Sequence, residues 1–124
     1  MKNKVLYPEL SYLLYGLCFQ IHNELGRFRN EVQYADAIEV ALKTNKIHYE
    51  REKYLAPSFE GEKRNGNKAD FIVDDKIVLE LKAKTTITKE DYFQTKRYLV
   101  SCGKKLGLLI NFRQKFLTPK RVLN

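Results

Sequence analysis

Two apolar segments joined by three polar residues constrain the fold of this chain most strongly. KADFIVDD and KIVLELKAK, which together span residues 68–84, have the composition of β-strands, and Asp74, Asp75 and Lys76 lie between the two apolar runs. So short a connection joins strands that pair as an antiparallel hairpin. The sequence therefore predicts a hairpin that is apolar enough to lie within a packed sheet.

Three charged residues interrupt the apolar pattern of this hairpin. Side-chain alternation places Glu80 and Lys82 on one face of the second strand, and hairpin pairing brings Asp70 of the first strand to the same face. A buried acid costs several kcal/mol unless it is paired or binds a metal. Glu-x-Lys alone is also common as a solvated surface pair. The Asp ten residues earlier on the neighbouring strand favours a site over that alternative.

A divalent cation would satisfy both carboxylates. Asp70 and Glu80 offer the hard oxygen ligands that suit Mg²⁺ or Mn²⁺, and the backbone carbonyl of Leu81 could complete the protein ligands. Such an ion lowers the pKa of bound water. Lys82 would then orient that water or accept its proton.

The remaining pattern predicts an α/β protein in which a mixed sheet is flanked by helices. Helices are expected over residues 8–25, 31–45 and 88–103, strands over 46–55, 106–112 and 115–124, and a loop over 56–67. Asn30 and Thr88 are the expected N-caps, and Pro119 restricts the last strand to an edge of the sheet. Several apolar side chains are expected in the core from the two N-terminal helices: Leu10, Leu13, Leu14, Leu17, Cys18, Ile21, Val32, Ala35, Ile38, Val40 and Leu42.

Length and composition predict one domain over residues 1–124, in a reducing, cytoplasmic setting. No apolar run reaches the ~18 residues that span a bilayer, and no secretory signal is evident. Cys18 and Cys102 are expected to be free thiols. The formal net charge of +8 suits a phosphate-binding surface, although solubility alone can account for a basic chain.

The motif Asp70…Glu80-Leu81-Lys82 resembles the active-site motif of the PD-(D/E)XK nuclease superfamily. Residues 10–124 are more closely similar to the GxxExxY proteins within that superfamily. The resemblance implies a restriction-endonuclease-like α-β-β-β-α-β core that hydrolyses phosphodiester bonds of nucleic acid, with DNA expected, and uses Mg²⁺ or Mn²⁺. The segments that carry this resemblance are GLCFQIHNELG, NEVQYADAI, KADFIVDDKIVLELKA, QTKRYL and LGLLINF.

The resemblance also implies roles for residues of the second helix. Glu31 and Tyr34 match the Glu and Tyr of the GxxExxY name, and a glutamate at the position of Glu31 approaches the metal in related nucleases. An acid in the first turn of a helix also interacts favourably with the helix dipole, so the sequence leaves both interpretations of Glu31 open. Phe28 stands where the family has glycine, which places the geometry of that turn in question.

The third helix resembles part of the nuclease domains of bacterial recombination helicases. Gln94 and Tyr98 match a Q-x-x-x-Y pattern that there orders the active site and contacts DNA. Lys96 and Arg97 lie on the same helix and are expected to bind the phosphate backbone. A polar glutamine beside a half-buried tyrosine is the structural alternative.

Two functions of different class follow from these patterns. The first is a small metal-dependent nuclease. The second is a catalytically silent module of the same fold that binds nucleic acid or a protein partner. No recognition domain is evident in the sequence. We therefore expect the protein to act with a partner, as a homodimer or in a larger complex. DNA versus RNA and endonuclease versus exonuclease cleavage stay open.

Overall fold

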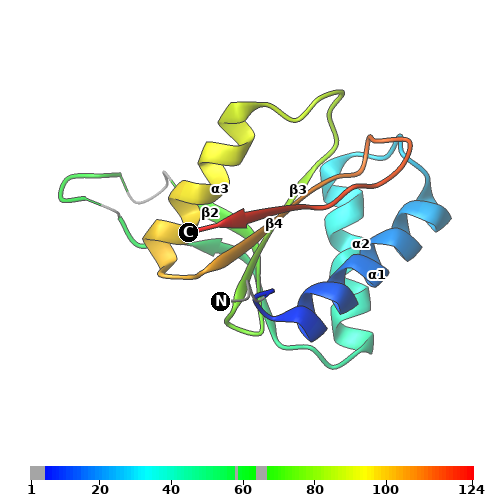
Figure 1. Cartoon of the computed structure of the whole chain (residues 1–124), viewed down its shortest axis with the longest axis horizontal. Coiled ribbons are helices and arrows are strands. Elements are labelled where there is room, and N and C mark those ends of the chain that lie inside the picture. The colour runs from blue at the N-terminus through cyan, green and yellow to red at the C-terminus, as the bar shows by residue number, and fades with distance from the viewer. Residues whose placement is uncertain (1–4, 58, 64–66) are drawn as a thin grey trace.

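The computed structural model describes residues 5–57, 59–63 and 67–124, and this part of the chain forms three helices and five strands (Figure 1). The predicted order of helices and strands is confirmed, whereas residues 58 and 64–66 of the predicted loop lie outside the described residues. In chain order the elements are α1 (Pro8–Leu25), α2 (Glu31–Thr44), β1 (Tyr49–Tyr54), β2 (Lys68–Val73), β3 (Ile77–Lys82), α3 (Lys89–Cys102), β4 (Leu106–Asn111) and β5 (Lys120–Leu123).

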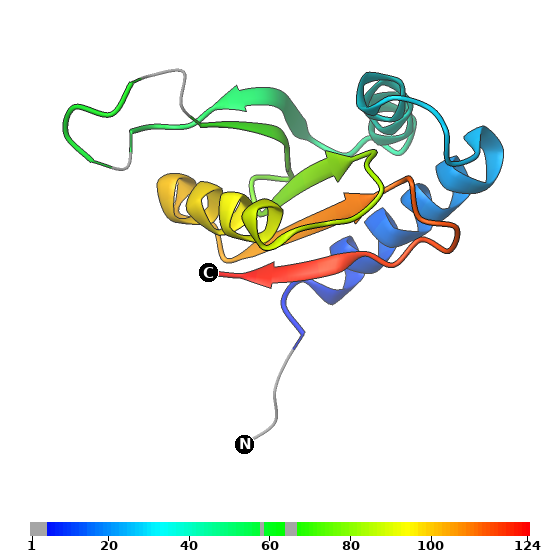
Figure 2. The ribbon, with the colours of Figure 1, turned by 90° about the horizontal axis from the view of Figure 1, so that it is seen from above.

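The strands form one mixed sheet in the order β1-β2-β3-β4-β5. Neighbouring strands are antiparallel except β3 and β4, which are parallel and are connected through α3. All six residues of β4 are buried, and β5 begins directly after Pro119 at the sheet edge. Helices α1 and α2 cover one face and α3 covers the other, as Figures 1 and 2 show. The predicted α/β class, with a mixed sheet flanked by helices, is therefore confirmed.

Side-chain alternation along β2 and β3 divides the core between the two faces of the sheet. Phe71, Leu79 and Leu81 pack toward α1 and α2, whereas Ile72 and Val78 pack toward α3. The hairpin turn fits this arrangement because its central residues, the two aspartates at 74 and 75, have φ values of 51° and 54°. Positive φ at both central positions is the requirement of a type I′ turn. The predicted hairpin is thus confirmed.

Short polar side chains fix the starts of the helices that carry site residues. Asn30 accepts a hydrogen bond from the backbone of Gln33, and the Gln33 side chain accepts one from the Asn30 backbone. Thr88 and Asp91 form the same reciprocal pair at the start of α3. These capping boxes satisfy amides that the helices leave unpaired, so α2 and α3 begin at the predicted residues.

Some predicted core positions are wrong. The exposed fractions of Val32 and Val40 are 64% and 63%, because α2 buries the stripe of Tyr34, Ile38 and Leu42 at four-residue spacing. Leu13 of α1 is likewise exposed. The periodic pattern located the helices correctly but assigned their inner faces only in part.

Tyr34 is buried and forms hydrogen bonds with the backbone of the turn between α1 and α2. Its hydroxyl donates to the Gly26 carbonyl at 2.5 Å and accepts from the Arg29 amide at 3.2 Å. Its ring stacks on Phe112 with a centroid distance of 4.2 Å. One side chain therefore joins the α1–α2 turn to the end of β4, and it sits three residues after Glu31.

The remaining predictions from composition agree with the described structure where it tests them. Both cysteines are free thiols, and burial raises the pKa of Cys18 to about 12. Across the described residues no helix combines the length and hydrophobicity needed to cross a membrane.

Gly107 on β4 allows α3 to approach the sheet closely. A Cβ atom at this position would lie 2.7 Å from Cγ2 of Thr95, whose hydroxyl donates to the Asp91 carbonyl. We expect Gly107→Ala to lower the free energy of unfolding by about 1–3 kcal/mol, as overpacking commonly does. Urea denaturation would measure the change.

Thr95→Ser removes the clashing methyl group and keeps the hydroxyl, so it supplies the matched control. The Gly107→Ala/Thr95→Ser double variant should recover part of the lost stability. If Gly107→Ala is as stable as the wild type, the close approach is not a constraint.

Candidate active site

Two carboxylates replace backbone pairing where β2 and β3 separate. The strands pair from Val73–Ile77 to Phe71–Leu79 and no further. Beyond that point the Asp70 amide donates to Glu80 Oε2 at 2.7 Å, and the Leu81 amide donates to Asp70 Oδ2 at 2.8 Å. The sequence thus places an acid on each strand at the first unpaired position, and each acid bonds the backbone of the other strand.

Burial and mutual repulsion make this pair of acids difficult to ionise. Burial raises the pKa of Glu80 to about 8, and the charge of Asp70 adds to the effect. Burial also raises the pKa of Asp70, with smaller contributions from Glu31 and Glu52. The charge of Lys82 opposes both shifts. Simultaneous ionisation of both carboxyls is therefore unfavourable, and a cation bound between them would favour it.

Lys82 extends toward α3, which supplies its polar partners. Its Nζ donates to Gln94 Oε1 at 3.1 Å and lies 3.8 Å from Asp91 Oδ1. Lys84 Nζ lies 2.9 Å from the other oxygen of Asp91. Burial opposes ionisation of Asp91, but hydrogen bonds from Thr88 and Lys84 hold its pKa below the ordinary value. Asp91 therefore supplies a fixed negative charge beside both lysines.

The structure places Gln94 against Lys82 and Tyr98 near Glu80, and leaves Lys96 and Arg97 farther out. Tyr98 is buried. Burial is the main cause that raises the pKa of its hydroxyl, and the charge of Glu80 contributes less. Lys96 Nζ lies 5.9 Å from the ring centre of Tyr92, and Arg97 is exposed. Buried Tyr98 and half-buried Gln94 thus face the candidate site, while the two cations lie on other sides of α3.

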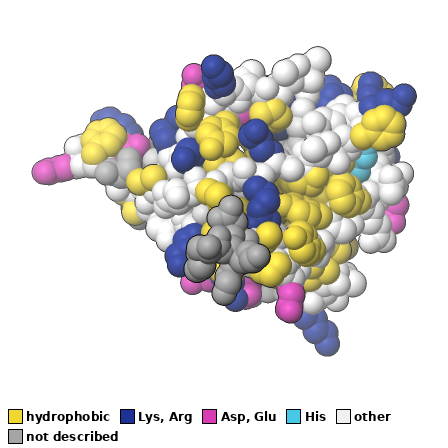
Figure 3. All heavy atoms as spheres, in the orientation of Figure 1, with side chains coloured by type: hydrophobic (Ala, Val, Ile, Leu, Met, Phe, Trp, Pro, Cys, Tyr) yellow, Lys and Arg dark blue, Asp and Glu magenta, His cyan; other side chains and the backbone are white. Residues whose placement is uncertain are grey.

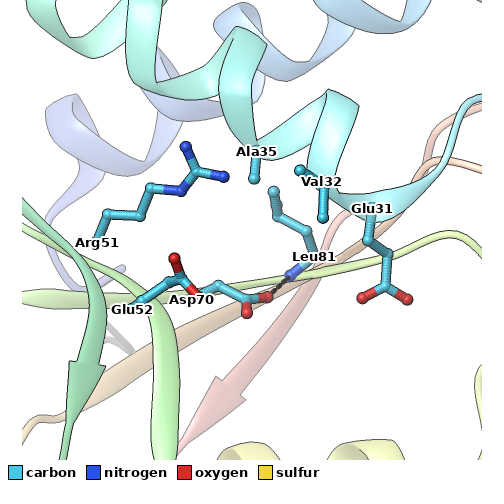
Figure 4. Close-up of a pocket in the computed structure, with 7 residues that line it drawn as sticks. All are labelled: Glu31, Val32, Ala35, Arg51, Glu52, Asp70 and Leu81. Carbon is cyan, nitrogen blue, oxygen red and sulfur yellow. Dashed lines mark hydrogen bonds between the residues drawn. The ribbon is translucent and has the colours of Figure 1, made fainter.

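Glu31 reaches the site from the opposite face of the sheet. A pocket of about 160 Å³ lies between α2 and the strands, and Figure 4 shows Glu31 and Asp70 among the residues that line it. Glu80 and Lys82 do not line this pocket, because their side chains lie on the α3 side. Asp70, in the gap between β2 and β3, therefore connects the two halves of the site. The pocket is lined by Glu31, Val32, Ala35, Arg51, Glu52, Asp70 and Leu81.

Glu52 is a further acid of this pocket that sequence reasoning missed. Strict alternation would place it on the face opposite Arg51, but its backbone φ is 52°, in the left-handed region. The β1–β2 register skips Glu52, which lies across from Asp70. The kink lets Glu52 and Arg51 line the same pocket, and Glu52 Oε1 lies 3.2 Å from Lys68 Nζ. Nothing in the residue pattern of β1 signals a left-handed glutamate.

The donor set of the site fits a hard divalent cation, although its ligands are not fully assembled. Among the described residues no three His, Cys, Asp or Glu side chains are already arranged to hold a metal. Asp70 and Glu80 each direct one oxygen to a backbone amide. Lys82 directs its carbonyl to Phe112 beyond β4, so alternation leaves the Leu81 carbonyl on the β2 side. Two carboxylates and one carbonyl could therefore contribute to an oxygen-rich site completed by water.

The raised pKa of Glu80 predicts a pH-dependent stability. Its ordinary value is 4.5 and its value in the folded protein is about 8, so between these values the folded state binds more protons than the unfolded state. The stabilisation is complete below pH 4.5 and is lost as the pH rises through 8. For the metal-free protein we expect the free energy of unfolding to fall from pH 5 to pH 8, by about 1.4 kcal/mol per pKa unit at most.

Urea titrations at several pH values would measure this slope. Glu80→Gln keeps a neutral hydrogen-bond acceptor and should flatten it, whereas Glu90→Gln, at an exposed site on α3, should not. A stability that rises with pH over this window in the wild type would contradict the assignment to Glu80.

Comparison with known proteins agrees with this geometry. No curated protein and no solved structure matches the chain. A family model described as the PD-(D/E)XK nuclease superfamily matches residues 8–122, from the start of α1 into β5, and nucleases of this superfamily generally use divalent metals. The chain therefore belongs to the PD-(D/E)XK nuclease superfamily.

Proposed function

We propose that this protein is a metal-dependent nuclease that hydrolyses phosphodiester bonds of nucleic acid, with DNA as the expected substrate. Superfamily membership supports the reaction class. One observation carries the proposal for this chain: Asp70 and Glu80 occupy the gap between β2 and β3, with Lys82 two residues beyond. Burial of two neighbouring carboxylates is costly without a cation, and a bound divalent cation would offset that cost.

Each residue of the gap has a proposed role. Asp70, Glu80 and the Leu81 carbonyl would hold Mg²⁺ or Mn²⁺. The bound ion would lower the pKa of water and stabilise charge that develops on the phosphoryl group. Lys82, fixed by Gln94 at 3.1 Å, would orient the attacking water or accept its proton.

The proposal extends to residues around the gap. Glu31 would contribute a further carboxylate from α2, because it shares the pocket of Asp70. Tyr98 would order Glu80, and Lys96 and Arg97 would contact the phosphate backbone. We also propose that the chain is a single domain of the GxxExxY type. The support is the Glu31–Tyr34 spacing, since Tyr34 fixes the turn from which Glu31 projects.

Metal binding and cleavage should separate in variants of the site. Lys82→Ala should retain Mn²⁺ binding and reduce Mg²⁺-dependent cleavage by about 10²–10⁴-fold, the usual contribution of a positioned acid or base. Glu80→Gln should lose both, because it weakens a ligand. Lys82→Arg should not restore cleavage, since guanidinium stays protonated. Calorimetry with Mn²⁺ and cleavage of labelled DNA and RNA would measure the two properties.

Lys76→Ala supplies the matched control. Exposed Lys76 precedes β3 at the opposite end from Lys82 and pairs with half-buried Asp74, so its removal should change neither property. Cleavage that survives Lys82→Ala would refute the role of that lysine. A wild type that binds metal yet cleaves neither DNA nor RNA would instead be the catalytically silent module.

Nucleic-acid binding should depend steeply on salt. Contacts from Lys and Arg to phosphates release counterions, so affinity falls linearly with salt on a logarithmic scale. We expect Lys96→Gln/Arg97→Gln to weaken binding and to reduce the slope by about 2, or about 1 per lost phosphate contact. Fluorescence anisotropy with metal-free protein at several salt concentrations would measure the slope.

Lys43→Gln/Lys46→Gln removes the same charge from the last turn of α2 and the residues just after it, and serves as the control. If both double variants reduce the slope equally, binding reflects net charge and does not involve a surface on α3.

A further inference from the structure

We propose that Phe28 forms a stacking site for an unpaired nucleobase beside the candidate active site, so that the protein prefers single-stranded nucleic acid to duplex. This inference rests on the proposed nuclease function and specifies its substrate. The site belongs to a surface that we term the aromatic–basic rim, which comprises Arg27, Phe28, Arg29, Arg113, Lys115 and Phe116.

Phe28 and Phe116 are the most exposed large hydrophobic side chains among the described residues, at 75% and 78%. Cations lie close to both rings. The Cζ atoms of Arg27 and Arg113 lie 4.9 Å and 5.7 Å from the ring centre of Phe28, and Lys115 Nζ lies 5.5 Å from that of Phe116. Exposed rings paired with cations suit a partner that offers both flat apolar groups and negative charge.

Contacts between two loops hold the rim in place. Arg113 Nε donates to the Arg27 carbonyl at 2.7 Å, which joins the loop after β4 to the α1–α2 turn. The carbonyl of Gln114 lies 2.8 Å from His22 Nε2 of α1. Figure 1 shows the two loops side by side. The Tyr34 hydroxyl also donates to the Gly26 carbonyl in the α1–α2 turn. The ring of Phe28 is therefore presented on a fixed backbone, which reduces the entropy lost on binding.

Both loops of the rim are close along the chain to residues around the acidic gap. Phe28 precedes Glu31 by three residues, which span at most about 10 Å, and Glu31 shares the pocket of Asp70. Arg113 follows the end of β4, where Asn111 is the register partner of Lys82. A strand whose phosphate lies at the gap would thus place a neighbouring nucleotide within reach of Phe28.

Nucleic acid in single-stranded form satisfies the chemistry of this rim. Exposed aromatic side chains stack on unpaired bases of any sequence, and interleaved cations follow the backbone. Bases of a duplex already stack on one another and present no free face except at ends. In Figure 3 dark-blue and yellow side chains lie next to one another over these loops, at the upper right. The concentration of positive charge favours a polyanion over an apolar protein segment as occupant.

Binding without cleavage provides the direct test. Metal-free protein, kept in EDTA, is titrated into a short fluorescein-labelled single-stranded DNA and into the corresponding duplex, and anisotropy is recorded. We expect the wild type to bind the single strand more tightly. Phe28→Ala should weaken that binding about 5- to 150-fold, the effect of losing one base–aromatic stack, and Phe28→Trp should retain it.

Two further readouts distinguish stacking from loss of charge or fold. The salt slope should be unchanged in Phe28→Ala, because the ring carries no charge. A 2-aminopurine base in the single strand should be quenched by the wild type and less so by the variant. Tyr12→Ala removes another exposed ring, near the start of α1 and away from the rim, and should have no effect.

The outcomes separate this inference from the proposed function. If the wild type binds single strand and duplex equally, or if Phe28→Ala binds normally, the stacking site is refuted while a nuclease function survives. If the wild type binds neither form even at low salt, the stacking site is refuted, whereas the nuclease function is decided separately by the Mg²⁺-dependent cleavage assay.

Discussion

Two hydrogen bonds from backbone amides to carboxylates connect β2 and β3 where their backbone pairing ends. The Asp70 amide donates to the Glu80 carboxylate, and the Leu81 amide donates to the Asp70 carboxylate. Without these acceptors, two amides at the centre of the sheet would lack partners, at about 1–3 kcal/mol each. The same oxygens are the proposed metal ligands. Binding of an ion must therefore share or replace contacts that stabilise the fold, so ligand variants require a stability measurement beside any activity.

The acidic gap also depends on all three layers of the molecule. The sheet positions Asp70 and Glu80, α3 holds Lys82 through Gln94, and α2 presents Glu31. Helix α3 can serve this purpose because it connects the parallel pair β3 and β4, and because Gly107 lets it lie close to the sheet. Long-range packing thus sets the position of each polar side chain, although the motif itself occupies thirteen consecutive residues.

Sequence reasoning predicted features that follow from local rules. The order of elements, the helix caps at Asn30 and Thr88, and the meeting of Asp70 with Glu80 all follow from periodicity, capping and hairpin pairing. The inner face of α2 was only partly predicted, because Tyr34 is buried by a tertiary contact with Phe112. Glu52 was missed because its left-handed backbone breaks the alternation on which strand predictions rest. The roles of the individual site residues stay predictions.

The distribution of charge explains how so basic a chain can carry an acidic centre. The net charge is +8, yet Glu31 and Glu52 lie in the pocket with Asp70, and Glu80 lies beside it. Those acids repel a phosphate, whereas the aromatic–basic rim and α3 attract it. Under the proposed function, the outer surface would therefore attract nucleic acid without metal, whereas entry of a phosphate into the centre would be favoured once a cation offsets the carboxylates. Metal and substrate should thus bind cooperatively at the centre while binding independently at the rim.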